Sequence, residues 1–67
     1  MNKEYFKGSW NIAKGKVKQK WGELTDDDLT HIDGDYDELV GRLQLRLGKT
    51  KDEAHKLADS LFDSEKV

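Results

Sequence analysis

Apolar side chains recur every three or four residues along almost the whole chain, and no proline interrupts them. This spacing matches the turn of an α-helix, and no alternating run is long enough to form a β-strand. In the first third of the chain the apolar residues fall on one helical stripe about 80° wide. The stripe consists of Phe6, Trp10, Ala13, Val17, Trp21 and Leu24. The pattern therefore predicts an all-α fold that begins with one long amphipathic helix over residues 4–22.

Capping signals divide the rest of the chain into three more helices. Thr25 and Asp35 are N-cap residue types, and each is followed three residues later by an acid, the spacing of a capping box. Thr50 and Glu53 repeat this pattern, and Gly48 is a residue type that ends helices because it readily adopts the left-handed conformation. The expected helices cover residues 26–31, 35–47 and 51–64, with a turn around Asp33 and Gly34.

Each of these helices has an apolar face that can point inward. The faces consist of Leu29 and Ile32 on the second helix, of Tyr36, Leu39, Val40, Leu43 and Leu47 on the third, and of Ala54, Leu57, Ala58, Leu61 and Phe62 on the fourth. Because only residues 48–50 join the last two helices, they should form an antiparallel or steeply crossed hairpin, and the short second helix should turn the first back over it. We therefore expect one domain over residues 1–67, a compact bundle of about four helices in two crossed helical hairpins.

Glycines occupy the side of the first helix that is opposite its apolar stripe. Gly8, Gly15 and Gly22 recur every seven residues, and a glycine inside a helix costs about 1 kcal/mol relative to alanine. This helix should therefore be weak by itself and should persist through packing. Ile12 and Leu45 fall outside the apolar stripes of their helices, so we expect both to be exposed.

The apolar content leaves little from which to build a core. Of the 67 residues, 34% are hydrophobic and 39% are charged, and a chain of this length buries only about 60% of the surface that its unfolded form exposes. No cysteine is present for a disulfide, and two histidines make a structural zinc site unexpected. Trp10 and Trp21 are among the largest apolar side chains, so we expect both in the core rather than on a membrane or base-stacking surface.

Charge changes sign along the chain. Residues 1–22 contain six lysines and one acid, residues 23–38 contain eight acids and no base, and residues 39–67 contain six bases and five acids. The basic segment could form a binding face for phosphates or an anionic membrane, or it could neutralise the acidic segment inside the fold. The net charge of −2 favours neutralisation. The candidate contacts for an anion or a nucleic acid are Lys7, Lys14, Lys16, Lys18 and Lys20.

Two short motifs resemble ligand-binding loops without meeting their requirements. Residues 48–50 have the ending of a phosphate-binding P-loop, but Leu43 stands where that loop needs its first glycine. The alternating acids that start at Asp33 resemble the beginning of an EF-hand calcium loop, but Glu38 replaces its glycine and Gln44 replaces its last glutamate. Helix ends and helix caps explain both segments better.

No arrangement of side chains predicts catalysis. His31 and His55 lie in polar stretches, and no serine has the surroundings of a nucleophile. We therefore expect no enzyme activity, no cofactor and no bound metal. Residues 1–9 lack the apolar run of a signal peptide, and nowhere do 18 apolar residues follow one another. We expect a cytoplasmic protein, monomeric and without a membrane span.

Two blocks of residues, which together cover about residues 8–56, are spaced as in a known family. The first block comprises Gly8, Trp10, Lys14, Gly15, Lys16, Val17, Lys18, Trp21, Gly22, Leu24 and the run Thr25 to Asp28. The second comprises Gly34, Asp37, Leu39, Val40, Gly41, Gln44, Gly48, Thr50, Lys51, Asp52 and Ala54. In these residues the chain resembles the CsbD-like family of small bacterial general stress proteins.

The resemblance implies a compact bundle of helical hairpins, similar to the SAM-domain-like arrangement, in a bacterial protein made during general stress or stationary phase. It implies no enzyme activity, ligand or site. We therefore expect a non-enzymatic general stress-response protein that acts through its surface, either as an interaction module for a protein partner or as a hydrophilic protectant. The alternative is a nucleic-acid-binding protein that uses the basic first helix.

Overall fold

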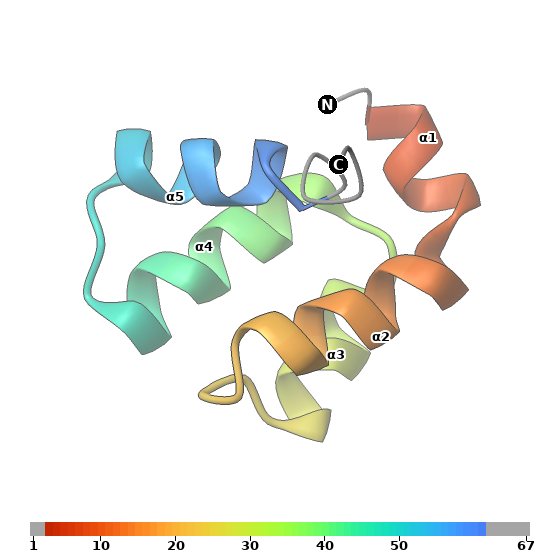
Figure 1. Cartoon of the computed structure of the whole chain (residues 1–67), viewed down its shortest axis with the longest axis horizontal. Helices are drawn as coiled ribbons and strands as arrows, with labels where there is room; N and C mark the ends of the chain where they lie inside the picture. The colour runs from red at the N-terminus through yellow and green to blue at the C-terminus, as the bar shows by residue number, and fades with distance from the viewer. Residues whose placement is uncertain (1–2, 62–67) are drawn as a thin grey trace.

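The computed structural model describes residues 3–61, and all regular structure in that range is helical (Figure 1). The helices are α1 (Lys3–Gly8), α2 (Trp10–Lys20), α3 (Asp26–Ile32), α4 (Tyr36–Leu47) and α5 (Lys51–Asp59). The predicted all-α fold is confirmed, with five helices in the described range where about four were expected.

Reciprocal capping boxes start α3 and α5, as the sequence predicts. The hydroxyl of Thr25 accepts from the Asp28 amide at 3.1 Å, and the Asp28 carboxylate accepts from the Thr25 amide at 2.9 Å. Thr50 and Glu53 make the same two hydrogen bonds at the start of α5, at 3.2 and 3.0 Å. Each box satisfies two amides that the first turn of a helix otherwise leaves unpaired. The described part of α5 ends at Asp59, five residues before the predicted end at residue 64, and residues 62–64 lie outside the described range.

The turn and caps around α4 form with one difference from the prediction. Asp35 accepts hydrogen bonds from the amides of residues 37 and 38, but Glu38 accepts from Arg42 instead of completing a capping box. Gly48 ends α4 in the left-handed conformation at φ 66°, as expected. Gly34, at φ 85°, forms the turn before α4, and a Cβ there would lie 3.4 to 3.6 Å from atoms of Lys7. This turn therefore requires glycine for its backbone angle and for the close approach of α1.

The prediction of one helix over residues 4–22 is wrong, because the chain breaks at Ser9. The break turns α1 away from the α2 axis and brings Phe6 onto α4. The rings of Phe6 and Tyr36 pack edge to face there, with centroids 6.0 Å apart. Tertiary packing thus overrides the helical periodicity at this position.

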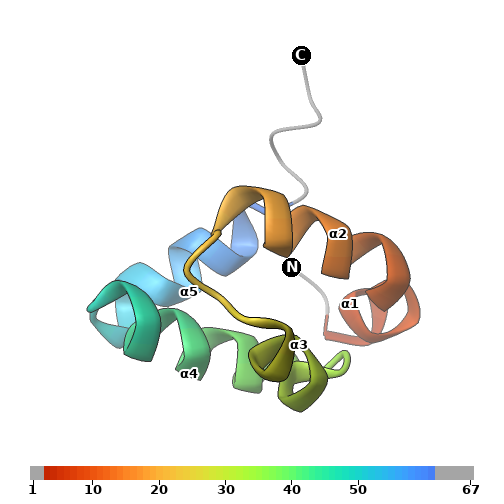
Figure 2. The same cartoon turned by 90° about the horizontal axis from the view of Figure 1, so that it is seen from below.

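The helices are arranged around a closely packed α4–α5 pair. These two helices form a hairpin joined by residues 48–50 and run in roughly opposite directions, the first of the two arrangements expected (Figure 1). α3 packs on α4, and α1 contacts both α2 and α4. Figure 2 shows α2 across one side of the bundle, with α3 and α4 on the other side. The SAM-domain-like detail of the expected bundle stays a prediction.

The core draws on every described helix and contains most of the side chains that the apolar stripes predict. Its buried members are Phe6, Ala13, Val17, Trp21, Leu24, Leu29, Ile32, Tyr36, Leu39, Val40, Leu43, Ala54, Ala58 and Leu61. Trp21 is 6% exposed, which confirms its assignment to the core. Trp10, Leu47 and Leu57 pack against the core but are only partly buried. The side chain of Trp10 is therefore less buried than expected. Phe62 lies outside the described residues.

Candidate functional site

Part of the basic segment neutralises the acidic segment, one of the two outcomes that the charge pattern left open. The ammonium group of Lys18 lies 2.9 Å from a carboxylate oxygen of Asp26. The hydrogen bond and the charge of Lys18 lower the pKa of Asp26, and the charge of Lys14 adds a smaller effect in the same direction. A second pair, Lys3 with Asp37 at 3.1 Å, joins α1 to α4. Both pairs are exposed, so each stabilises the fold only slightly.

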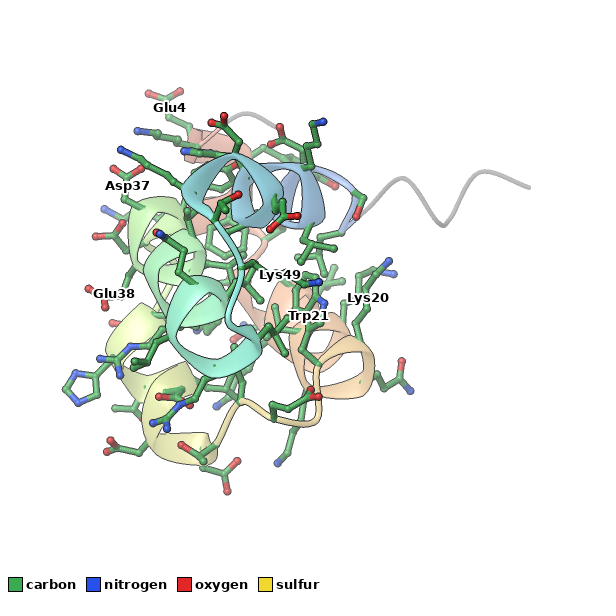
Figure 3. All side chains as sticks on the ribbon, turned by 90° about the vertical axis from the view of Figure 1, so that its left-hand side faces the viewer. Glu4, Lys20, Trp21, Asp37, Glu38 and Lys49 are labelled. Carbon is green, nitrogen blue, oxygen red and sulfur yellow. The ribbon has the colours of Figure 1, made fainter. Side chains whose placement is uncertain are left out.

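The five candidate lysines do not converge on one site. Lys14 and Lys18 face Asp26, whereas Lys16 and Lys20 lie one turn apart on another flank of α2. Lys7 belongs to α1 and packs beside Gly34. Figure 3 shows Lys20 on the edge of the molecule opposite to Glu4, Asp37 and Glu38. The lysines are therefore spread over α1 and two flanks of α2 and do not form one binding site.

An open hollow of about 440 Å³ lies where α1 passes the turn between α3 and α4. Its walls carry Lys3 and Lys7 together with three carboxylate side chains and Tyr36. The complete lining is Lys3, Glu4, Lys7, Asp33, Gly34, Asp35 and Tyr36. Because side chains of both charge signs line it, the hollow has no strong preference for an anion or a cation.

A buried carboxylate, which the sequence pattern did not predict, joins α3 to α4. Asp28 has no exposed surface. Arg46 donates to both of its oxygens at 2.9 and 3.0 Å, and Arg42 donates to one at 3.1 Å. The hydrogen bond from Arg46 is the main reason that the pKa of Asp28 lies far below its usual value, and Asp28 in turn raises the pKa of Arg46. The group is held ionised and fully hydrogen-bonded, as a buried charge requires.

The sequence did contain a signal for this network. Arg42 and Arg46 are the only arginines in the chain, and their spacing of four places both guanidinium groups on one side of α4. Arginine binds a carboxylate through two parallel hydrogen bonds, which lysine cannot do. Two arginines at this spacing in a chain otherwise rich in lysine therefore indicate a fixed acidic partner, although not which of the many acids it is.

Tyr36, His55 and Asp59 form a second polar cluster, between α4 and α5. The phenol of Tyr36 donates to a carboxylate oxygen of Asp59 and lies 3.5 Å from Nδ1 of His55. Burial, and then the hydrogen bond to Asp59, raise the pKa of Tyr36, so the phenol stays protonated. His55 is thus more closely packed than its polar stretch of sequence suggested. A protonated, buried phenol joins the two helices and is unsuited to act as a nucleophile.

The described residues present no further chemical centre. Within residues 3–61, no three side chains of histidine, cysteine, aspartate or glutamate are grouped to hold a metal ion. No helix in the same range has both the length and the apolar content needed to cross a membrane.

Comparison with known proteins places these features in a family. The family model described as CsbD-like matches residues 4–56, most of the chain. The chain belongs to the CsbD-like family. The match begins four residues before the stretch recognised in the sequence and includes the five candidate lysines, Asp28 and both arginines. The match ends at residue 56. Asp59, which accepts the hydrogen bond from Tyr36, therefore lies outside the part of this CsbD-like chain that matches the family model.

Its relatives cover almost its whole length. The UPF0337 protein YjbJ of Escherichia coli O6:H1 is 55% identical over 60 residues, which are 90% of this chain and 87% of the relative. A UPF0337 protein of Pectobacterium atrosepticum is 55% identical over 56 residues, or 84% of this chain and 81% of the relative. One from Protochlamydia amoebophila is 48% identical over 56 residues, or 84% and 85%.

Proposed function

We propose that this CsbD-like chain is a non-enzymatic general stress-response protein of the bacterial cytoplasm that acts through its surface. Membership of the CsbD-like family is the observation that carries the proposal. The surface supports it, because the chain is 39% charged and has a mean hydropathy of −0.95. The buried polar groups of Tyr36 and Asp28 are engaged in holding helices together rather than presented to a substrate.

Two modes of surface action can be separated. As an interaction module, the protein would need its fold and a specific contact, for which exposed Ile12 and Leu45 are the best candidates at 63% and 65% exposure. As a hydrophilic protectant, it would need only its composition. The interaction mode has the better support, because a protectant has no need of the buried Asp28 network that fixes α3 against α4.

Deletion and complementation in the source bacterium test the function and the mode together. Loss of the gene should lower survival under osmotic, heat or stationary-phase stress, and the wild-type gene should restore it. In the interaction mode, neither the unfolded variant Trp21→Ala nor the folded variant Ile12→Gln/Leu45→Gln restores survival. Restoration by the unfolded variant would establish the protectant mode. Unchanged survival in every stress after deletion would refute the proposed function.

Nucleic-acid binding through Lys7, Lys14, Lys16, Lys18 and Lys20 is the second candidate. It is favoured by the absence of any acid between Tyr5 and Gly22 and disfavoured by the pairing of Lys18 with Asp26. Such binding should weaken steeply as salt is added. An NMR titration with duplex DNA, single-stranded DNA and RNA at low salt tests it. Unchanged amide shifts with all three nucleic acids would eliminate it.

A further inference from the structure

α2 lacks the local features that stabilise the three helices after it. Ser9 precedes it, but the Ser9 side chain caps none of its amides, because the hydroxyl donates backwards to the Tyr5 carbonyl at 2.6 Å. The first turn of α2 carries no acid, whereas α3, α4 and α5 all begin with side-chain caps and acids. Gly15 lies in the middle of α2, and nothing within 4 Å would obstruct a Cβ there. α2 therefore depends on the burial of Ala13, Val17 and the adjacent Trp21.

The other three helices form a unit that does not need α2 for its internal contacts. α4 packs closely on both α5 and α3, while α2 approaches α1 more closely than it approaches any of these three. The Asp28 network lies entirely between α3 and α4. The ion pair between Lys18 of α2 and Asp26 of α3 is exposed. Separation of α1 and α2 together leaves the Asp28 network and the packing of α3 and α5 on α4 in place. It breaks the contacts of Phe6 with Tyr36 and of Lys3 with Asp37.

The apolar stripe of this segment fits a second conformation. Phe6, Trp10, Val17 and Trp21 lie on one face only if the helix is continuous, yet the folded chain breaks at Ser9 and leaves Trp10 partly exposed. We propose that α1 and α2 open from the α3–α5 unit, straighten into one helix and bind an anionic lipid surface through this stripe. Folding buries the stripe, and opening presents it.

The charges of the segment match that partner. Residues 5–22 contain five lysines and no acid, and the lysines flank the stripe on both sides, as in helices that lie in the interface of an anionic membrane. Opening also breaks the contact between Lys18 and Asp26, so the full positive charge becomes available only in the open state. A lipid interface accepts the lysines and the whole apolar stripe together, whereas a nucleic acid offers phosphates to the lysines and bases only to the aromatic rings.

Native-state hydrogen exchange of the full chain tests the opening. The amides of Ala13 to Val17 should exchange at least about tenfold faster than those of Leu39 to Leu43, because their helix opens without global unfolding. Equal exchange rates in α2 and α4 would show that the molecule opens only as a whole and would overturn the proposal.

Vesicle binding tests the partner. Vesicles of phosphatidylglycerol should shift the tryptophan emission to the blue and protect α2 from exchange, and vesicles of phosphatidylcholine should do neither. Lys14→Gln/Lys20→Gln should bind about 30-fold more weakly. Lys49→Gln/Lys51→Gln, which removes the same charge from exposed positions near the start of α5, should bind nearly as well as wild type.

Equal loss of binding in the two variants would indicate general charge attraction and contradict the proposal. Binding to phosphatidylcholine, or no binding to either vesicle, would contradict it too. Circular dichroism of each variant verifies that the fold is retained. Survival of stress and binding of lipid are separate measurements, so the proposed function can hold where lipid binding fails.

Discussion

At the residue scale, the Asp28 carboxylate belongs to two structures at once. It completes the capping box that begins α3, and it receives Arg42 and Arg46 from α4. A helix cap is normally local, but here the same oxygens fix the docking of a second helix. The two guanidinium groups reach Asp28 from partly exposed positions, while the carboxylate is fully enclosed. Its removal therefore affects the start of one helix and the position of another.

Asp28→Asn should lower the free energy of unfolding by about 3 kcal/mol, because it leaves two arginines beside a neutral group. Urea denaturation followed by circular dichroism measures the change. Asp27→Asn is the matched control, because the Asp27 side chain is next to Asp28 in sequence but 80% exposed. This substitution should change the free energy of unfolding by less than about 0.5 kcal/mol. Similar losses in the two variants would show that the Asp28 network contributes little.

The two tryptophans should differ in their effect on stability. Trp21→Ala should cost about 3 kcal/mol or more and leave much of the chain unfolded at 37 °C, because an almost fully buried indole is lost. Trp10→Ala should cost about half as much, because its ring is only partly buried against Phe6 at a centroid distance of 5.4 Å. Thermal melts of the two variants compare them. A larger loss for Trp10→Ala would contradict this order.

At the scale of the helices, glycine has opposite effects at different positions. Gly15 and Gly41 lie inside α2 and α4 with open space around the place of a Cβ. Gly15→Ala and Gly41→Ala should each raise the free energy of unfolding by about 1 kcal/mol. Gly34→Ala and Gly48→Ala should lower it, because both backbones have positive φ angles. Melting temperatures of the four variants test this division, and a loss of stability in Gly15→Ala would contradict it.

The helices show which parts of the fold the sequence could predict. The starts of α3 and α5 follow from Thr25 and Thr50, because a capping box is read from residues three apart. The break at Ser9 could not be predicted, since the same apolar periodicity continues through it and the contact of Phe6 with Tyr36 exists only in the folded bundle. Local chemistry was decisive at the helix starts, and tertiary packing was decisive at the break.

The sequence identified the candidate lysines but could not predict which of them would lie together or which acids they would contact. Their clustering depends on which acids the fold brings near, and Asp26 reaches Lys18 through the crossing of two helices. The arginine partners of Asp28 and the contact of Tyr36 with Asp59 likewise join residues 14 to 23 positions apart. Sequence spacing gives the face of a helix on which a charge lies, but not the partner that the face meets.

At the scale of the whole molecule, acid should destabilise the fold. The pKa values of Asp28, Asp26, Glu53 and Asp59 are all lowered by their partners in the folded state. A carboxyl group of this kind contributes stability that is present above its unfolded pKa of about 4 and is lost as the pH falls through its folded pKa. The urea concentration at the midpoint of unfolding should therefore fall steadily as the pH is lowered from about 5 to about 2, across the range in which these carboxyl groups take up protons.

Asp28→Asn should make this pH dependence shallower, because the most strongly shifted group no longer titrates. Urea midpoints of the variant and the wild type across the same pH range provide the comparison. Parallel pH profiles for the two proteins would show that other carboxyl groups cause the acid sensitivity.

The unequal capping of the helices has a consequence for the kinetics of folding. Contacts between capped neighbours close short loops, so the α3–α5 unit should already be formed in the transition state, while α2 docks afterwards. Leu43 and Val17 are both fully buried, one on each side of this division. In stopped-flow chevron plots, Leu43→Ala should slow folding, whereas Val17→Ala should leave the folding rate within about twofold and accelerate unfolding. If Val17→Ala slowed folding as strongly as Leu43→Ala, α2 would belong to the nucleus.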